Sequence, residues 1–454
     1  DYVIISQLAD ERITPAAWFQ AGIGQVVKVV DVGFNGFRIY PPLRDNINPD
    51  SKPKVMRPDF IYNSGVEDLT ILFANASLSR YEYIGTVFTL SYATNSWIRN
   101  VQARNAYANF VDVGNSAKIS IVDSHFKRVQ KPTYTNTYAL GLGGKTSDSL
   151  ITNNILEDVW VTGIFSGSAN GNVYSYNYEK DIREDHGIFH HGTYPFENLI
   201  EGNDAYRITH DCWWGRQGPG ITYFRNRASE VRTSMNGACE SEGLVADRLN
   251  VIANTARYFL SYPWCSYPDN CFDFDRMNTN MWVEKNRYRV KFIGIATPES
   301  TNTFIDNVKG ETAPAEWANF DMPASLYLTS APDFWCKETP WPAIGSNIDD
   351  FNNLNKLPAQ RRYEGLQCTP IENDICIHSS DCVDQNPCTY DLCKDSACIS
   401  NNANLDGGVN IGLGDIVQVI ANWATAGPTG DLDSNGNVGL SDIIAVISLW
   451  ANTC

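Results

Sequence analysis

The sequence predicts a mainly β chain in which a long β-solenoid is followed by a small disulfide-rich module and a small pair of helices. Three observations support this. Short alternating strands recur at a nearly regular interval, six of the twelve cysteines cluster between Cys368 and Cys398, and a loop–helix unit occurs twice near the end. The expected divisions are residues 1–335 for the solenoid, 336–367 for a capping or linking segment, 368–400 for the cysteine-rich module and 401–454 for the paired helices.

In the N-terminal part, short runs of alternating apolar residues repeatedly end in a polar residue. An Asn at such a corner can adopt left-handed backbone and hydrogen-bond to its neighbours in a ladder. One strand per interval of about 23 to 31 residues indicates a solenoid, because an antiparallel sandwich would place turns roughly every 8–12 residues. The longest interval predicts a loop that leaves the stack at residues 131–142. The polar anchors are Asn100, Asp123, Asn154, Asn177, Asn203 and Asn226.

Four segments of the chain carry a resemblance to a known fold family: Gly65–Ile71, His191–Pro195, Asn198–Asn203 and Phe224–Arg227. The right-handed parallel β-helix superfamily, typified by the pectate lyases, is similar to this chain over roughly residues 20–310. The resemblance implies the fold and says little about the reaction. Members usually carry more chain ahead of the segment that matches residues 1–6, so the N-terminal cap is expected to be missing or cleaved.

The net charge and the cysteine content indicate where the protein is located and which classes of partner it is expected to bind. The formal net charge of −17 disfavours nucleic acid and anionic membrane surfaces, and no apolar run is long enough to span a bilayer. Twelve cysteines favour disulfides and a secreted, extracellular or cell-surface protein. The chain starts at Asp1 without a signal peptide, which suggests a processed form. Cysteine spacing leaves the pairing open, with Cys212–Cys239 and Cys398–Cys454 as plausible bridges.

The C-terminal repeat has the pattern of calcium-binding loops, each followed by an apolar helix. Oxygen-bearing side chains alternate along the second loop around Gly436, which permits the sharp turn. The first loop has Gly408 and Val409 at positions where an oxygen ligand and the turn glycine are usual, so we expect a weaker or empty site. The helices are predicted at 416–423 and 443–450. The expected Ca²⁺ ligands are Asp431, Asp433, Asn435, Asn437 and Asp442 in the second loop and Asn404, Asp406, Asn410 and Asp415 in the first.

A duplicated loop–helix unit of this kind resembles a dockerin module. The resemblance implies a cohesin-like protein as the partner, although another copy of this chain is an alternative. In dockerins, loop positions 10 and 11 carry recognition. Here those positions are Leu413, Gly414, Leu440 and Ser441. The cysteine cluster resembles small extracellular repeats whose cores are too small to fold without disulfides.

Residues able to perform chemistry gather in one stretch of the solenoid. Four of the six histidines lie there among carboxylates, arginines and aromatic rings, and successive strands are expected to place them on one side. A lyase needs a base and a charge stabiliser, whereas a hydrolase needs two carboxylates. The catalytic candidates are Asp185, His186, His190, His191, His210, Asp211 and Arg216. The candidate sugar-binding residues are Tyr194, Tyr206, Trp213 and Trp214.

Three readings of function remain open from sequence alone. The first is a secreted polysaccharide-active protein, lyase or glycoside hydrolase, tethered through its tail. The second is a non-catalytic structural or adhesive protein that polymerises into filaments. The third is a carbohydrate-binding module. The histidine-rich stretch fits either catalysis, a stacked structural hydrogen-bond network or a metal site.

Overall fold

In the computed structural model, the described part of the chain forms two compact units, Asp1–Thr369 and Pro370–Cys454. The structure describes residues 1–13, 21–75, 85–131, 137–183, 187–234, 246–262, 278–279, 281–292, 301–310, 314, 317, 322–345, 355–371, 386–394, 397–425, 429–450 and 453.

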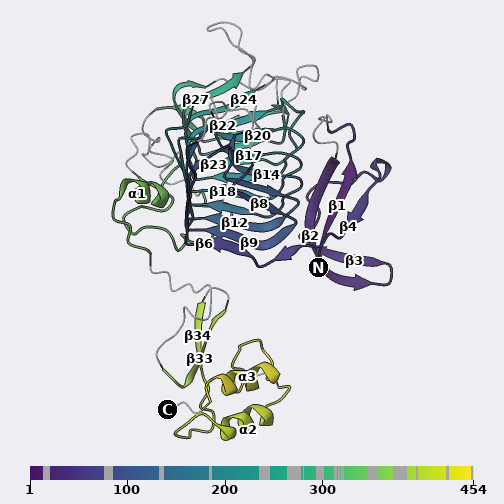
Figure 1. The fold of residues 1–454 in the computed structure, drawn as a ribbon, viewed down its shortest axis with the longest axis vertical. Helices are drawn as coiled ribbons and strands as arrows, with labels where there is room; N and C mark the ends of the chain where they lie inside the picture. Colours follow the sequence, from purple (N-terminus) through teal and green to yellow (C-terminus); the bar gives the residue numbers. More distant parts are fainter. Residues whose placement is uncertain are drawn as a thin grey trace. The chain divides into compact units, whose positions relative to one another are not determined.

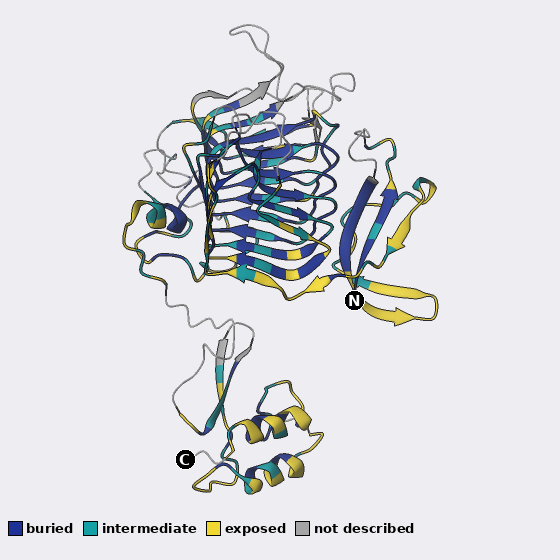
Figure 2. Ribbon diagram, viewed as in Figure 1, coloured by how far each residue is buried: buried dark blue, intermediate teal, exposed yellow. Residues whose placement is uncertain are grey.

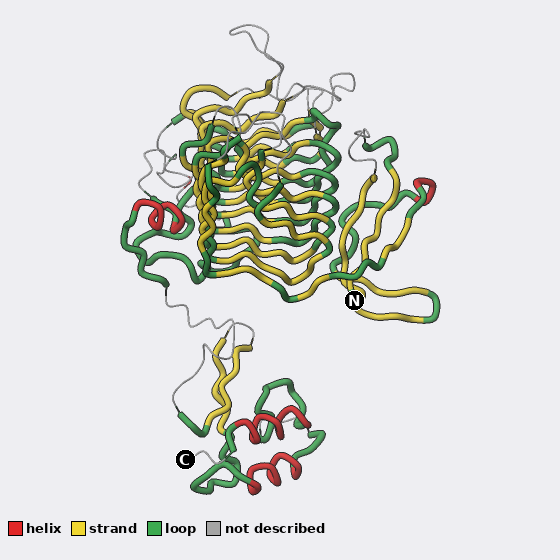
Figure 3. Tube along the Cα trace, viewed as in Figure 1, coloured by secondary structure: helices red, strands yellow, loops and turns green. Residues whose placement is uncertain are grey.

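The first unit is mainly β, and two long parallel sheets dominate its described residues (Figures 1 and 3). The first sheet contains β5 (Ile61–Tyr62), β6 (Gly65–Glu67), β9 (Ala93–Arg99), β12 (Ala117–Val122), β15 (Leu150–Thr152), β18 (Val173–Ser175), β21 (Leu199–Glu201), β23 (Thr222–Phe224), β26 (Asn250–Ile252), β29 (Trp282–Glu284) and β31 (Thr303–Ile305). The second contains β7 (Thr70–Leu72), β8 (Phe88–Ser91), β10 (Gln102–Ala106), β11 (Val111–Gly114), β13 (His125–Val129), β14 (Tyr138–Gly143), β16 (Ile155–Glu157), β17 (Val161–Phe165), β19 (Tyr178–Lys180), β20 (Ile188–His191), β22 (Asp204–Asp211), β24 (Arg227–Ser234), β27 (Thr255–Tyr262), β30 (Arg287–Phe292) and β32 (Val308–Lys309).

The chain crosses these sheets in a repeating order. It passes through β12, then β13 and β14, and then returns through β15, β16 and β17. Each strand pairs in parallel with its equivalent one repeat later, as β12 does with β15 and β14 with β17. The inward side chains of both sheets form one hydrophobic core (Figure 2). This arrangement is compatible with the predicted parallel β-helix.

A ladder of buried Asn side chains joins successive repeats. Each Asn Oδ1 accepts from the backbone N–H of the preceding ladder residue at 2.9–3.1 Å, and each Nδ2 donates to a backbone carbonyl of that preceding repeat. These bonds satisfy backbone groups that the strand ends would otherwise leave unpaired. The ladder runs through Ser124, Asn154, Asn177, Asn203, Asn226, Asn254, Asn286 and Asn307.

The predicted anchors Asn100 and Asp123 are not ladder residues. They occupy the preceding position, where the backbone is left-handed with φ of 49° and 56°. The alternating pattern predicts one residue for both the left-handed turn and the ladder bond, whereas the chain divides them between two consecutive residues. The anchors at 154, 177, 203 and 226 are confirmed as ladder residues.

The predicted loop at residues 131–142 is wrong over its second half. Residues 138–142 belong to β14, which pairs with β11 and β17 inside the second sheet. Alternating small and apolar side chains suit this strand, since Leu140 and Leu142 point into the core. Residues 132–136 lie outside the described residues.

An antiparallel sheet of four strands lies against one side of the stack (Figure 1). Its backbone bonds to the turns of the stack, where Ser147 Oγ accepts from Val26 N–H at 3.1 Å and Asn170 Nδ2 donates to Gly24 O at 3.1 Å. The sheet therefore covers one edge of the repeats. Its strands are β1 (Tyr2–Leu8), β2 (Ala21–Gly33), β3 (Gly36–Tyr40) and β4 (Lys54–Met56).

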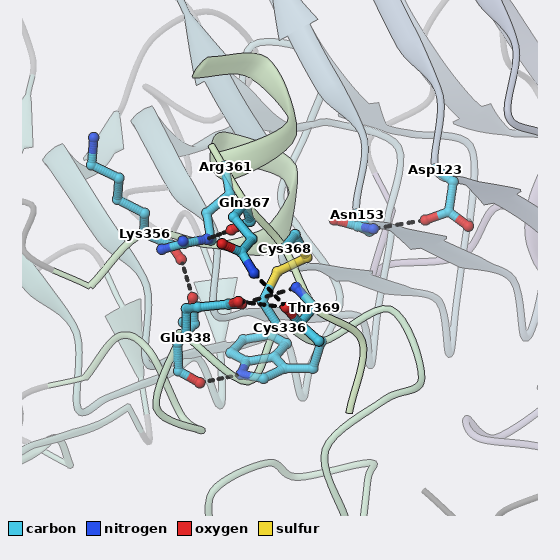
Figure 4. Close-up of a disulfide and its surroundings, with 11 residues drawn as sticks. Asp123, Asn153, Cys336, Glu338, Lys356, Arg361, Gln367, Cys368 and Thr369 are labelled. Carbon is cyan, nitrogen blue, oxygen red and sulfur yellow. Dashed lines mark hydrogen bonds between the residues drawn. A yellow bond between two sulfur atoms is a disulfide. The ribbon is translucent and has the colours of Figure 1, made fainter. Parts of the chain in front are cut away.

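The described residues of the segment expected as a cap or linker, 336–345 and 355–367, pack on a different edge of the stack. Helix α1 (Pro358–Glu364) contributes Ala359 to a small core with Ile155 and Tyr178. A disulfide between Cys336 and Cys368 closes this segment (Figure 4). Cys368 was expected in the cysteine-rich module, so that assignment is wrong.

The second unit combines a hairpin with two helices. Strands β33 (Thr389–Lys394) and β34 (Ala397–Asn402) pair antiparallel, with Cys393 opposite Cys398. Helices α2 (Leu413–Ala421) and α3 (Leu440–Ser448) each begin three residues earlier than predicted. Their inward side chains share a core with the loops: Ile411, Val419, Leu432, Val438, Ala445 and Val446.

Candidate functional site

Strand alternation divides the histidine-rich cluster into two groups. In β20 and β22, His190 and His210 face one another in register and are fully buried. Their neighbours His191 and Asp211 also pair in register but point to the other face of the sheet. The expectation that the whole cluster shares one lateral face is therefore wrong, because adjacent residues of a strand project to opposite sides.

His190 and His210 form an internal network with Tyr223. The Tyr223 hydroxyl lies 3.1 Å from His190 Nδ1 and 3.0 Å from His210 Nδ1, and Phe165 stacks on the His190 ring. Burial lowers the pKa of His190 well below its usual value, with His210 adding to the effect. Burial lowers the pKa of His210 to about 3. Both rings are therefore neutral at physiological pH and act as core residues in this structure.

His191 and Asp211 form the part of the cluster that reaches the surface. His191 Nδ1 and Asp211 Oδ2 are 2.7 Å apart, and the His191 side chain is about 20% exposed. Burial opposes charge on His191, but the Asp211 carboxylate outweighs it and raises the pKa of the imidazole. No described residue hydrogen-bonds to the other ring nitrogen, Nε2. A histidine oriented by a carboxylate in this way can exchange a proton with a bound molecule.

The aromatic candidates differ in exposure. Trp213 is half exposed, and its backbone N–H donates to Asp211 Oδ1 at 3.3 Å, so its position is tied to the His191–Asp211 pair. Trp214 and Tyr206 are partly buried, and Arg207 lies over the Tyr206 ring. Trp213 is the candidate ring best placed to stack on a sugar beside His191.

Two candidates contact the N-terminal segment instead of solvent. The Arg216 guanidinium donates to the carbonyls of Arg12 at 2.8 Å and Glu11 at 3.1 Å. Tyr194 is buried and donates its hydroxyl to Asp45. Sequence reasoning could not anticipate these contacts, because it did not predict that the N-terminal strands β1–β4 pack against the stack. Asp185 and His186 lie outside the described residues.

Sequence reasoning missed Glu179, a carboxyl inside the stack. Its oxygens accept from Thr162 Oγ1 and from the backbone N–H of Tyr206. Burial raises the pKa of Glu179 to about 8, which the hydrogen bonds only partly offset. The side chain is neutral at pH 7. Glu179 pairs in register with Leu156, a core residue of the neighbouring repeat. Alignment of the repeats would therefore have placed Glu179 at an inward position.

The two C-terminal loops have the same hydrogen-bond pattern. Asp442 accepts from the backbone N–H groups of Leu432, Asp433 and Gly439. Asp415 accepts in the same way, at matching distances, from the three corresponding residues of the first loop, Leu405, Asp406 and Gly412. Each aspartate thus joins the start of its loop to the first turn of its helix, which explains why both are buried.

Carboxylates converge in the second loop. Asp431, Asp433 and Asp442 bring one oxygen each within 4.8 Å of one another. Hydrogen bonds from Asn435 and Gly436 to Asp431 hold the loop closed around them. Asn435 and Asn437 are exposed, and the Asn437 N–H donates to Asn435 Oδ1. A set of convergent oxygens fits a hard cation such as Ca²⁺.

The first loop has fewer charged ligands. Asn404 takes the place of Asp431, and its Oδ1 is buried without a hydrogen-bond partner while its Nδ2 donates to Gly408 O. Asp406 Oδ1 accepts from Gly408 N–H, and Asn410 is exposed. An unpartnered oxygen at the first loop position is compatible with a weaker cation site.

Each helix of this unit, together with the turn that follows it, exposes a row of large apolar side chains. The two rows match position by position, and their members are 48–67% exposed. Leu413 and Leu440, for which the dockerin resemblance implies partner contact, begin these rows. Gly414 lies against Asp406, and Ser441 faces Asn435 in its loop. The other members, which sequence reasoning missed, follow at helical spacing. The rows are Leu413, Val417, Ile420 and Trp423 in one and Leu440, Ile444, Ile447 and Trp450 in the other.

In comparisons with known proteins, no family model matches this chain and no curated protein matches it significantly. Within the described part of the chain, no helix has the length and apolarity needed to cross a membrane.

Proposed function

We propose that this chain is a secreted polysaccharide-active protein with a right-handed parallel β-helix body and a dockerin-like tail that docks in the presence of Ca²⁺. The observation that supports the docking function is a duplication in the tail: each loop has the same aspartate hydrogen-bond pattern, and each helix has the same exposed apolar row. The hydrogen bonds that Asp415 accepts in the first loop recur at Asp442 in the second loop. The exposed apolar row of α2 has a matching row on α3. Large apolar side chains in a contiguous exposed row are typical of interaction surfaces.

In this proposal the loops hold the helices in position for docking. Asp431, Asp433, Asn435 and Asp442, with the Asn437 backbone, would hold Ca²⁺ in the second loop. Asn404, Asp406 and Asp415 would hold it more weakly in the first. The ion would neutralise the clustered carboxylates, which repel one another without it. The partner is a cohesin-like domain, and a second copy of this chain is the alternative.

Association measurements on the full chain test docking. Binding to a set of cohesin domains, and self-association by sedimentation, are measured with Ca²⁺ and with a chelator. The double variant Trp423→Ala/Trp450→Ala should abolish Ca²⁺-dependent association while keeping the circular dichroism spectrum. Trp213→Ala, in the other unit, serves as the control. If neither cohesin binding nor self-association depends on Ca²⁺, the docking proposal is wrong.

The surface pair His191–Asp211 supports a lyase in preference to a hydrolase. One histidine, oriented by a carboxylate beside an exposed Trp213, supplies a base and a stacking ring. A hydrolase needs two carboxylates that flank the substrate, and the pair supplies one, Asp211. Asp211 is already engaged with His191.

Turnover of uronate-containing polysaccharides tests this part of the proposal. A lyase releases unsaturated products that absorb ultraviolet light, so each cleavage is detected directly. His191→Ala should reduce turnover at least 100-fold, and Trp213→Ala should mainly raise KM. A wild-type chain that docks but cleaves no member of a broad panel would instead support the non-catalytic structural reading.

A further inference from the structure

A groove of about 840 Å³ lies away from the His191–Asp211 pair. One wall is a column of left-handed turn residues from successive repeats, and the other is the C-terminal segment around helix α1 that the Cys336–Cys368 disulfide closes (Figure 4). Its volume suits a ligand of several rings. The column consists of Asp68, Asn100, Asp123 and Asn153.

Hydrogen bonds within the column use its amide N–H groups and leave oxygens available. Asn100 Nδ2 donates to Asp68 Oδ1 at 2.8 Å, and Asn153 Nδ2 donates to Asp123 Oδ1 at 2.7 Å. Since each residue belongs to the next repeat, neighbouring members are spaced by roughly 4.8 Å, the separation of adjacent strands. The groove therefore offers a row of regularly spaced acceptors.

The groove becomes more enclosed along this column. Asp68 and Asn100 are exposed, Asp123 is partly buried, and Asn153 is only 2% exposed. Asn153 Oδ1 has no hydrogen-bond partner, and Asp123 fixes its orientation by accepting from Nδ2. A buried acceptor without a partner is costly, so its presence at the enclosed end points to an external donor.

The charges in the groove do not favour an anionic ligand. Arg99 is paired with Glu67 at 2.7 Å. Arg362 is occupied by the Asn153 carbonyl, to which it donates at 2.6 Å, and it lies near the Asp123 carboxylate. Neither arginine among the described residues of the groove forms an ion pair with Asp68. The lining therefore suits a neutral molecule that is rich in hydroxyl donors. Phe334 and Pro358 add apolar surface for its ring faces.

We propose that this groove binds the end of a neutral oligosaccharide, whose hydroxyl groups donate to the Asp123 and Asn153 oxygens. A single cation fits the column poorly, because the carboxylates of Asp68 and Asp123 are two repeats apart, or roughly 10 Å. The proposal goes beyond the lyase and docking functions and is independent of both. It would give the chain a second attachment to polysaccharide.

Calorimetric titration of the full chain with neutral hexaoses (cello-, manno-, xylo- and malto-hexaose) tests the proposal, with a galacturonic acid hexamer as the charged comparison. At least one neutral hexaose should bind. Asn153→Gly should weaken its Kd at least tenfold, since the left-handed backbone (φ 55°) accepts Gly and only the side chain is lost. Asp123→Asn should weaken it about threefold.

Matched controls separate ligand contact from loss of fold. Asn63→Gly and Asp181→Asn alter left-handed residues outside the groove and should leave Kd unchanged. His191→Ala should also leave it unchanged, which distinguishes this groove from the proposed lyase site. If Asn153→Gly fails to fold, Phe334→Leu, which keeps apolar packing but removes the ring, should weaken binding instead. Absence of neutral-hexaose binding, or binding that these groove variants do not change, would overturn the proposal.

Discussion

At the residue scale, the charge of His191 depends on one neighbour. The Asp211 carboxylate raises the pKa of His191 against the opposing effect of burial. We expect Asp211→Asn to lower that pKa, because the amide keeps the shape of the side chain but removes its charge. Titration of the imidazole by NMR measures the change. An unchanged pKa would show that Asp211 does not determine the charge of His191.

The same pair predicts a pH dependence of stability. The folded pKa of His191 is raised above its unfolded value, near 6.5. Its charged interaction therefore stabilises the fold fully below that unfolded value and is lost as the pH rises through the folded pKa. The free energy of unfolding should differ between wild type and Asp211→Asn by about 1 kcal/mol at acidic pH and by less at alkaline pH. A pH-independent difference would contradict this.

Glu179 gives a pH dependence of the same sign, at a group that is neutral when protonated. Its folded pKa, about 8, lies above the unfolded value, so the folded state holds a proton that the unfolded state releases between those two pH values. Stability attributable to Glu179 should therefore fall from about pH 4.5 to pH 8. Glu179→Gln imitates the neutral acid and should unfold with a free energy a few kcal/mol higher than wild type near pH 8 and similar near pH 4. Urea denaturation at both pH values measures this.

At the element scale, the Asn ladder contributes stability through backbone groups. Asn203 Oδ1 accepts from Asn177 N–H and Asn203 Nδ2 donates to Tyr174 O, so Asn203→Ala leaves both buried groups unpaired. We expect a loss of about 2–4 kcal/mol in the free energy of unfolding. Asn100→Gly, at an exposed turn, should cost less than about 1 kcal/mol. Equal costs would contradict the ladder's role.

The ladder and the duplicated C-terminal loops could be predicted because their residues recur at regular intervals in the sequence. The ladder residues Asn154, Asn177, Asn203 and Asn226 recur at a nearly regular spacing, and the C-terminal loop–helix unit recurs at a fixed offset. Both patterns can be read directly from the sequence. The left-handed position before each ladder residue is occupied by different residue types, including Tyr176 and Arg225. That variety explains why Asn100 and Asp123 were assigned to the wrong position.

The site was harder to predict because it depends on strand phase and on distant packing. His190 and His191 are adjacent in sequence, and only the register of β20 places one in the core and the other at the surface. Arg216 and Tyr194 hydrogen-bond to Arg12 and Asp45, which are distant in the sequence, so local spacing does not reveal these contacts. The apolar rows of α2 and α3 could have been found from their helical spacing, since neither row is needed for the small core of that unit.

At the scale of the whole molecule, the two units should respond differently to Ca²⁺. The first unit has a large core of its own, whereas the second has a small one and clustered carboxylates. Differential scanning calorimetry should therefore show two transitions, with a chelator lowering only that of the second unit. Ca²⁺ at 1,000 times its Kd would stabilise this unit by about 4 kcal/mol. A single transition that shifts with Ca²⁺ would contradict independent unfolding.

The most direct test of the account is Ca²⁺ titration of the full chain by isothermal calorimetry. We predict saturable binding that Asp433→Ala abolishes in the tighter site, while Asp406→Ala affects at most a weaker second site and Asp181→Asn has no effect. Absence of saturable binding in the wild-type chain, or binding that survives Asp433→Ala unchanged, would contradict the claim that the duplicated tail is a calcium-dependent docking module.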